Sequence, residues 1–309
     1  MGKIYIGISG WRYAPWRGVF YPKGLPQRLE LAYASRTAHS IELNGSFYSL
    51  QRPQHYEQWH DETPPGFVFA VKGPRYVTHV LRLKGAEQAL ANFFASGLFK
   101  LRDKLGPLLW QFPPSFRFEP QTFDAFLRLL PQNTGQALAL ARRRDERMKG
   151  RACLAIDAER PLRHAVEVRH DSFLDPAFVK LLRRHKVALV VADTAGKWPW
   201  REDVTGDFVY MRLHGDQELY ASGYSPEALS RWAERMERWA RGDQPADARL
   251  IDPERAPRPR ASRDVYCYFD NDAKVHAPFD AAGLRSALGL PAPAVAPGQP
   301  WDAVTERRR

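Results

Sequence analysis

Eight short apolar runs alternate with helix-like segments along this chain of 309 residues, and this alternation limits its fold more than any other feature. Apolar runs that are separated by amphipathic segments indicate parallel strands joined by crossover helices. Eight such strands close a barrel, so the sequence predicts an α/β fold of the (β/α)8 TIM type. An open doubly wound sheet is the alternative, but no glycine-rich phosphate-binding fingerprint follows the first run. The predicted strands are Ile4–Ser9, Ser40–Asn44, Phe67–Lys72, Leu108–Phe112, His164–His170, Val187–Asp193, Phe208–His214 and Val265–Asp270.

Proline and capping residues mark the starts of several helices between these runs. Pro53 stands where a helix can begin, and the pairs Asp175-Pro176 and Ser225-Pro226 each place a capping side chain before a proline at the first helical position. The stretch from Ala86 to Leu105 has a helical pattern of apolar residues, which Gly106-Pro107 would end.

We expect one barrel domain over residues 1–290, which fits the roughly 250 residues that such a barrel needs. Residues 136–163 form an insertion rich in Arg and Ala that we expect to be helical. Residues 291–309 carry several prolines and end in three arginines, so we expect a loose C-terminal tail.

The charge of the chain favours anionic partners. The formal net charge is +11 and the isoelectric point is about 9.7, which suits phosphates, nucleic acid or acidic metabolites, or else a solvated, arginine-rich surface. The two cysteines, Cys153 and Cys267, lie in apolar surroundings, so we expect no disulfide framework and a reducing compartment. The start MGKIYIGISGW lacks the apolar core of a signal peptide, and no run of about 18 apolar residues occurs. We therefore expect a cytoplasmic protein with no membrane partner.

Most of the predicted strands end in polar residues. In His164–His170, Val166 and Val168 point to one face, whereas Glu167 and Arg169 point to the other. Barrel enzymes keep their active sites at the C-terminal ends of the strands. The side chains expected at that end are Ser9, Glu42, Asn44, Lys72, Gln111, Glu167, Arg169, Asp193, Arg212, His214, Asp270, Asn271 and Asp272.

A buried charge is costly unless it is paired. The many charged side chains expected at this open end of the barrel, its mouth, therefore either neutralise one another in an internal ion-pair layer or form a binding site for a ligand. In the structural interpretation, Glu167 pairs with Arg169 or Arg212 in an ion-pair layer. In the functional interpretation, three cationic side chains at strand ends, Lys72, Arg169 and Arg212, need an anionic partner, and a ligand can supply it.

The leading hypothesis is an enzyme that acts on a small anionic or phosphorylated substrate at this mouth. The candidate catalytic residues are Glu42, Glu167 and His214. The candidate substrate-binding residues are Asn44, Lys72, Gln111, Arg169, His170, Asp193, Arg212 and Asn271, although His170 suits the orientation of a loop better than contact with a ligand.

Three alternatives stay open. A protein that binds or processes nucleic acid would use the charge and the loop aromatics Trp11, Tyr13, Trp16, Tyr48, Trp198 and Trp200 to contact phosphates and stack bases. A glycosidase would use Glu42 and Glu167, which lie three strands apart. A metal-dependent phosphoesterase or isomerase would need a ligand set that the sequence does not favour, since only His214 is a well-placed imidazole and the cations would repel a metal. No metal site is predicted, and the sequence assigns no cofactor.

Several segments together resemble the YecE-like family, catalogued as domain of unknown function 72. The resemblance extends over residues 3–288. It is carried by GISGWRYAPWRGVFYP (7–22), IELNGSFYSL (41–50), TPPGFVFAVKGP (63–74), LGPLLWQFPPSF (105–116), AVEVRHDSF (165–173), YMRLHG (210–215) and YCYFDND (266–272).

The resemblance implies a (β/α)8 barrel and a cytoplasmic bacterial protein, and it implies no settled activity. Two residues depart from the family pattern: Asp270 stands where asparagine is frequent, and Phe173 where tryptophan is frequent. The recurring polar positions of the family fall here on Glu42, Asn44, Lys72, Gln111, Glu167, Arg169, His170, Asp193, Arg212, His214 and Asn271.

Overall fold

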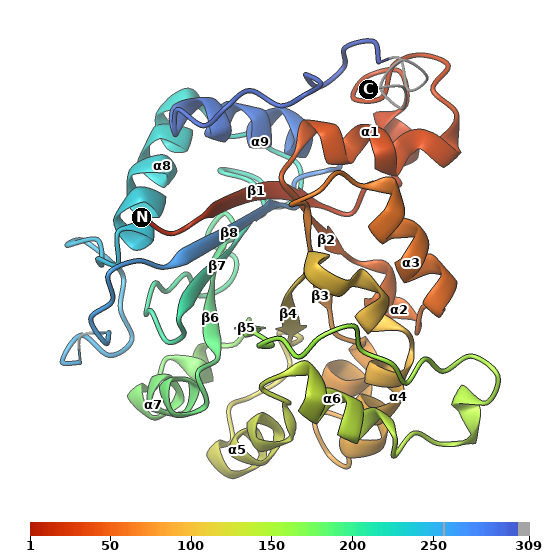
Figure 1. Ribbon diagram of the computed structural model, residues 1–309. Coiled ribbons are helices and arrows are strands. Elements are labelled where there is room, and N and C mark those ends of the chain that lie inside the picture. The colour runs from red at the N-terminus through yellow and green to blue at the C-terminus, as the bar shows by residue number, and fades with distance from the viewer. Residues whose placement is uncertain (256, 302–309) are drawn as a thin grey trace.

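The computed structural model describes residues 1–255 and 257–301, and it confirms the predicted barrel (Figure 1). Each strand pairs in parallel with the next along the chain, and β8 pairs with β1 to close the ring. The strands are β1 (Ile4–Ser9), β2 (Ser40–Leu43), β3 (Val68–Lys72), β4 (Leu105–Gln111), β5 (His164–Glu167), β6 (Ala188–Asp193), β7 (Phe208–Leu213) and β8 (Asp264–Phe269).

Helices surround the barrel, and their starts follow the predicted signals (Figure 1). Pro53, Pro176 and Pro226 each occupy the beginning of a helix. The Asp175 and Ser225 side chains accept hydrogen bonds from the backbone N–H groups of Ala177 (2.8 Å) and Ala228 (3.1 Å). The α-helices of the described residues are α1 (Glu30–Thr37), α2 (Gly45–Tyr48), α3 (Pro53–Glu62), α4 (Glu87–Ala95), α5 (Pro120–Leu129), α6 (Thr134–Ala141), α7 (Pro176–His185), α8 (Pro226–Ala240) and α9 (His276–Ala287).

The prediction of one helix from Ala86 to Leu105 is wrong. Helix α4 ends at Ala95, a 3₁₀ helix follows over Leu98–Lys104, and β4 starts at Leu105. Gly97 turns the chain between the two with φ of 102°, and a Cβ placed there would lie 2.4 Å from Pro53 Cα. A tertiary contact with α3 therefore sets this break, which the helical pattern of apolar residues does not reveal.

The insertion and the tail both contact the barrel's helices. In residues 136–163, α6 packs against α4, Arg143 donates to Glu87 at 2.6 Å, and much of the remainder is irregular. In the tail, Tyr33 Oη of α1 donates to the carbonyls of Ala296 (3.1 Å) and Gln299 (3.0 Å). The terminal arginines, 307–309, lie outside the described residues.

The barrel interior has an aromatic layer in its middle and polar side chains toward the C-terminal ends of the strands. Tyr210 and Tyr268 pack against each other in a tilted arrangement, with ring centroids 5.2 Å apart, and belong to the core cluster inside the barrel. Gly7 lets β1 approach β2 closely, since a Cβ on it would lie 1.9 Å from the Ser40 carbonyl oxygen. The next inward-facing residues toward the strand ends are polar, so the packed aromatic layer forms the floor of the polar mouth.

None of the helices within residues 1–255 and 257–301 combines the length and the apolar character that crossing a membrane requires.

Candidate active site

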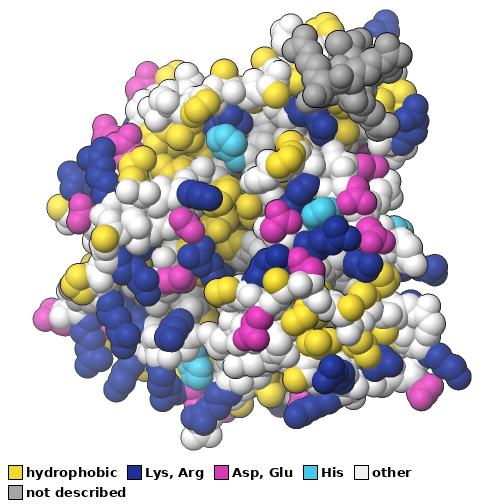
Figure 2. Space-filling model, viewed as in Figure 1, with side chains coloured by type: hydrophobic (Ala, Val, Ile, Leu, Met, Phe, Trp, Pro, Cys, Tyr) yellow, Lys and Arg dark blue, Asp and Glu magenta, His cyan; other side chains and the backbone are white. Residues whose placement is uncertain are grey.

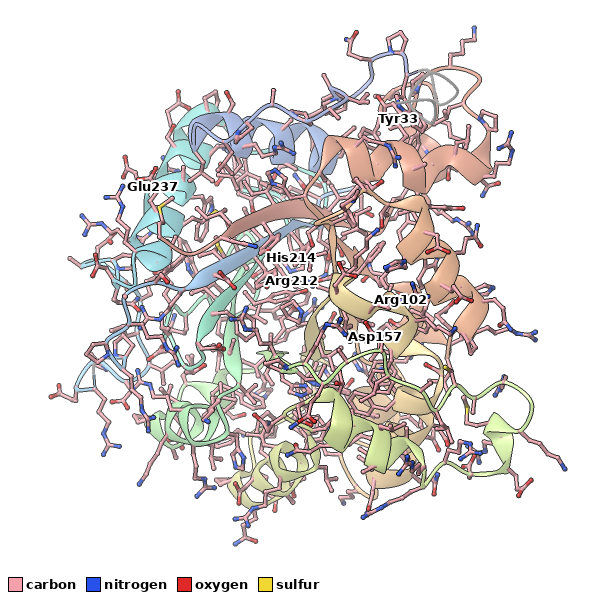
Figure 3. The ribbon with its side chains drawn as sticks, viewed as in Figure 1. Tyr33, Arg102, Asp157, Arg212, His214 and Glu237 are labelled. Atoms are coloured by element: carbon pink, nitrogen blue, oxygen red, sulfur yellow. The ribbon has the colours of Figure 1, made fainter. Side chains whose placement is uncertain are left out.

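Arg212 on β7 lies at the centre of the polar mouth, and all three of its guanidinium nitrogens donate hydrogen bonds to other side chains of the protein. Nε donates to Glu42 Oε2 (3.0 Å), Nη1 to Glu167 Oε2 (2.7 Å), and Nη2 to Glu42 Oε1 (2.9 Å), Asp270 Oδ2 (2.8 Å) and Ser9 Oγ (3.2 Å). Figure 3 shows Arg212 next to His214, whose Nε2 lies 3.4 Å from Nη1. The Arg212 cluster is defined as Ser9, Glu42, Glu167, Arg212, His214 and Asp270.

Glu42 is fully buried within the Arg212 cluster. Its carboxylate has no exposed surface and accepts hydrogen bonds from Ser9 Oγ (2.6 Å), Tyr210 Oη (2.7 Å) and Arg212. Both oxygens are therefore occupied, and neither faces open space. Glu42 thus lies below the open mouth, contrary to its predicted role as an acid or base in contact with substrate.

Glu167 is held between two arginines. Arg169 donates to its Oε1 at 2.7 Å, Arg212 donates to its Oε2 at 2.7 Å, and Glu167 is only 1% exposed. Burial opposes ionisation, but Arg169 and Arg212 hold the pKa of Glu167 well below its usual range. The ion-pair interpretation from the sequence fits these two glutamates. The glycosidase hypothesis required carboxyl groups open to water, and the structure argues against it.

His214 and Asp270 complete the Arg212 cluster. His214 Nδ1 lies 3.0 Å from Asp270 Oδ2, and the imidazole is fully buried. Burial and the neighbouring Arg212 lower the pKa of His214, so the ring is neutral at pH 7. Burial works against ionisation of Asp270, yet Arg212 and His214 keep the pKa of this carboxyl low.

A cavity of about 590 Å³ opens above the Arg212 cluster. Its wall combines cations, carboxylates, amides and aromatic rings from loops that are far apart in the sequence. We call it the mouth cavity, and it is lined by Tyr13, Asn44, Phe47, Tyr48, Lys72, Arg75, His79, Gln111, Arg169, Tyr220, Asp270, Asp272 and Ala273.

Asn44 Oδ1 in the wall of the mouth cavity is a buried acceptor without a partner among the described residues, and Lys72 and Gln111 extend into the same wall. They end the neighbouring strands β3 and β4 and are 8% and 6% exposed. Among the described residues, neither side chain has a hydrogen-bond or ion-pair partner; Lys72 Nζ lies only over the Phe47 ring, 4.3 Å from its centroid. Burial and the charge of Arg212 lower the pKa of Lys72 to about 8.

The rim adds charged groups of both signs. Arg169 stacks on the Trp198 ring with its guanidinium carbon 3.9 Å from the ring centroid, and exposed Arg75 lines the cavity beside it. Burial, together with Asp270, raises the pKa of Asp272 to about 6. Arg75 was missed by the sequence analysis because it lies three residues beyond the end of β3, where it caps a short π-helix over Tyr76–Val80; a basic residue just after a strand end was the available signal.

Of the predicted site residues, Asn44, Lys72, Gln111 and Arg169 line the mouth cavity, whereas three others have structural partners elsewhere. Asp193 Oδ2 accepts from Tyr224 Oη (3.1 Å) and borders a neighbouring cavity. Asn271 Nδ2 donates to Asp280 Oδ2 (2.7 Å) and thereby ties the loop after β8 to α9. His170 Nδ1 accepts from Ser172 N (3.0 Å) at the start of a short 3₁₀ turn.

Most loop aromatics pack on the protein. Trp11 and Trp16 are buried, and Trp16 Nε1 donates to the Asp272 carbonyl at 3.3 Å. Trp198 lies under Arg169, and Trp200 packs against Trp232 with ring centroids 5.2 Å apart. Tyr48, which ends α2 and is 72% exposed, is the exception among the aromatics that the sequence placed in loops.

The carboxylates of the Arg212 cluster surround a guanidinium, which takes the central position that a metal ion would need. Across the described part of the chain, no group of three or more His, Cys, Asp or Glu side chains is arranged to hold a metal.

Comparison with known proteins identifies relatives of this chain. The UPF0759 protein YunF of Bacillus subtilis (strain 168) is 31% identical over 137 residues, which cover 43% of this chain and 47% of that protein. The UPF0759 protein YecE of Escherichia coli (strain K12) is 26% identical over 133 residues, covering 43% and 45%. The chain thus spans about half the length of these curated relatives.

Solved structures share the barrel. A DUF72 family protein from Thermotoga maritima MSB8 superposes with a TM-score of 0.69 at 26% identity, covering 93% of this chain and 99% of that one. A DUF72 family protein from Enterococcus faecalis V583 gives a TM-score of 0.66 at 16% identity, covering 97% and 99%, and this likeness shows the fold alone. The family model described as "Protein of unknown function DUF72" matches residues 5–304. Because that match runs through nearly the whole chain, the chain belongs to the DUF72 family.

Proposed function

We propose that this protein is an enzyme whose mouth cavity binds a small anionic substrate through a carboxylate or phosphate group. One observation carries the proposal: Lys72 and Gln111 are more than nine-tenths buried, line the cavity and have no protein partner among the described residues. The Lys72 ammonium and the Gln111 amide are therefore available to a ligand in the cavity, and Asn44 Oδ1, a buried acceptor in the same wall with no partner among the described residues, adds a third polar atom that a ligand can satisfy.

The division of charge supports an anionic ligand. The Glu42, Glu167 and Asp270 carboxylates are bonded to Arg212, and Glu167 is also bonded to Arg169. Lys72 has no such partner within hydrogen-bond distance in the described chain. A ligand oxyanion at Lys72 and Gln111 would accept a charge-assisted and an amide hydrogen bond, with Arg75 nearby at the rim.

Two titratable groups support catalysis rather than binding alone. The pKa of Lys72 is lowered to about 8 and that of Asp272 is raised to about 6, and both side chains line the mouth cavity. Groups whose pKa values lie near neutrality can donate and accept protons at the pH of the cell. These two residues therefore replace Glu42 and Glu167 as our candidates for proton transfer.

Calorimetric titration with inorganic phosphate at pH 7 tests the binding. We expect Lys72→Met and Gln111→Leu to weaken phosphate binding by about tenfold or more, because each removes a hydrogen bond to a charged ligand. Lys180→Met, which removes an exposed lysine on α7, is the matched control and should leave affinity unchanged. Equal binding by all four proteins would contradict the proposal.

A further inference from the structure

We propose that Lys72 is a covalent catalytic residue, whose amine forms an imine with the carbonyl carbon of an anionic aldehyde or ketone, such as a 2-oxo acid or a phosphorylated aldehyde. The inference rests on the proposed function, since it names the substrate class of the same cavity.

A second buried lysine shows what is unusual about Lys72. Lys104 is 5% exposed, and its Nζ donates to the carbonyls of His60 (2.5 Å) and Thr63 (2.6 Å) and to Thr63 Oγ1 (3.1 Å). Those three acceptors use all three ammonium protons, so Lys104 is a structural residue. Lys72, at 8% exposed, is also buried but has no acceptor in the described chain, and its side chain lines an open cavity instead.

The surroundings of Lys72 favour a reactive amine. An amine must be neutral to attack a carbonyl, and enzymes achieve this by burial and by a neighbouring cation. Both occur here, because Lys72 is only 8% exposed, lies over the Phe47 ring and is close to the charge of Arg212. With the pKa of Lys72 lowered to about 8, about a tenth of the amine is neutral at pH 7.

The cavity also contains a proton donor for the reaction. Nζ attacks the carbonyl carbon, the nitrogen loses a proton and the carbonyl oxygen gains one, which gives a carbinolamine. The hydroxyl then takes a further proton and leaves as water while the carbon–nitrogen double bond forms. In balance, one neutral amine, one carbonyl and one proton give a protonated imine and one water. We assign the donated proton to Asp272, whose pKa of about 6 leaves part of it protonated near neutrality.

Trapping with a small anionic aldehyde tests the inference. The full-length protein is incubated with glyoxylate and sodium cyanoborohydride, which transfers hydride to the imine carbon and fixes it as a secondary amine. Peptide mass spectrometry then locates the product. We expect Lys72 to be labelled about tenfold faster than any exposed lysine near pH 7, because more of its amine is neutral. Its labelling rate should level off above about pH 8, whereas an ordinary amine continues to gain up to about pH 10.4.

Variants separate this inference from the proposed function. Lys72→Arg keeps the positive charge but cannot form an imine, so we expect it to lose the fast label and still bind oxalate, an anion of similar shape with no reactive carbonyl. Lys180→Arg should keep the fast label. If oxalate binds but glyoxylate labels Lys72 no faster than exposed lysines, the imine is overturned and the anion site stands. If oxalate and phosphate both fail to bind the wild-type protein, the proposed function itself is overturned.

Discussion

At the scale of single residues, Arg212 and Lys72 have different roles at the C-terminal end of the barrel. The hydrogen-bonding capacity of Arg212 is used within the protein, since every guanidinium nitrogen has an acceptor in the Arg212 cluster. Lys72, one layer nearer to solvent, has none among the described residues. The first residue therefore stabilises the interior, and the second is open to a ligand. Their substitutions should separate stability from binding.

Replacing Arg212 should destabilise the fold. In Arg212→Met, Glu42, Glu167 and Asp270 lose their shared partner inside the barrel, so we expect the free energy of unfolding to fall by about 3–5 kcal/mol. Urea denaturation measures the change. Arg241→Met, just beyond the end of α8, is the control, since that arginine is largely exposed and pairs with Glu237 one turn away; a loss within about 0.5 kcal/mol is expected. Similar losses in both variants would contradict the assignment of Arg212 as a structural residue.

Anion affinity should fall in two steps as the pH rises. Sulfate is a suitable probe because it stays fully ionised over the range. Asp272 gains a negative charge as the pH rises through about 6, and Lys72 loses its positive charge as the pH rises through about 8; both changes disfavour an anion. We expect each step to cost about tenfold in affinity by calorimetry. Asp272→Asn should remove the first step and keep the second. If the sulfate affinity changes by less than about twofold between pH 5 and 9, Asp272 and Lys72 do not titrate beside the bound anion, and the proposed site is contradicted.

At the scale of elements, the strand order brings the site together. Lys72, Gln111 and Glu167 end β3, β4 and β5, and Arg212 reaches across the barrel from β7. The close approach of β1 to β2 places Ser9 within 2.6 Å of Glu42. The segments that follow the strands then supply the rim, with Arg75 at the start of a π-helix after β3 and Asp272 after β8.

The turn between α4 and the 3₁₀ helix should tolerate no side chain. Gly97→Ala would meet both an unfavourable φ and a Cβ 2.4 Å from Pro53 Cα, so we expect a loss of about 2 kcal/mol or more in urea denaturation. Gly150 has a φ of 71° but open space around it, and Gly150→Ala should cost only about 1 kcal/mol. Equal costs would show that the contact with Pro53 does not matter.

Local sequence patterns predicted the strands and the helix starts. The roles of the site residues depend on tertiary contacts between strands, which local patterns do not reveal. Alternating runs identified all eight strands, and the proline caps at Pro53, Asp175 and Ser225 were correct because their causes lie within a few residues. The β5 prediction extended three residues too far, to His170, whose ring caps the next turn. The sequence placed Glu42 and Lys72 at the same end of the barrel. It could not show that Glu42 is sealed and Lys72 open, because that depends on which strand-end partner each one reaches.

At the scale of the whole molecule, the face seen in Figure 2 carries charge that is spread over it rather than gathered in one patch. Lys and Arg lie over much of the visible face with Asp and Glu among them (Figure 2). The net charge of +11 should therefore give weak, sequence-independent contact with nucleic acid. In fluorescence anisotropy with single- and double-stranded DNA and RNA, we expect a Kd no tighter than about 1 μM at 0.15 M salt, weakening steeply as salt is added. Tight binding that resists salt would favour the nucleic-acid alternative instead.

The most direct test of an anion site in the mouth cavity is a crystal of the full chain soaked in tungstate, with the metal located by its anomalous scattering. The account predicts a tungstate oxygen within hydrogen-bond distance of Lys72 Nζ and Gln111 Nε2, and loss of that peak in Lys72→Met crystals. An empty cavity in the wild-type crystal, with tungstate found only on surface arginines, would contradict it.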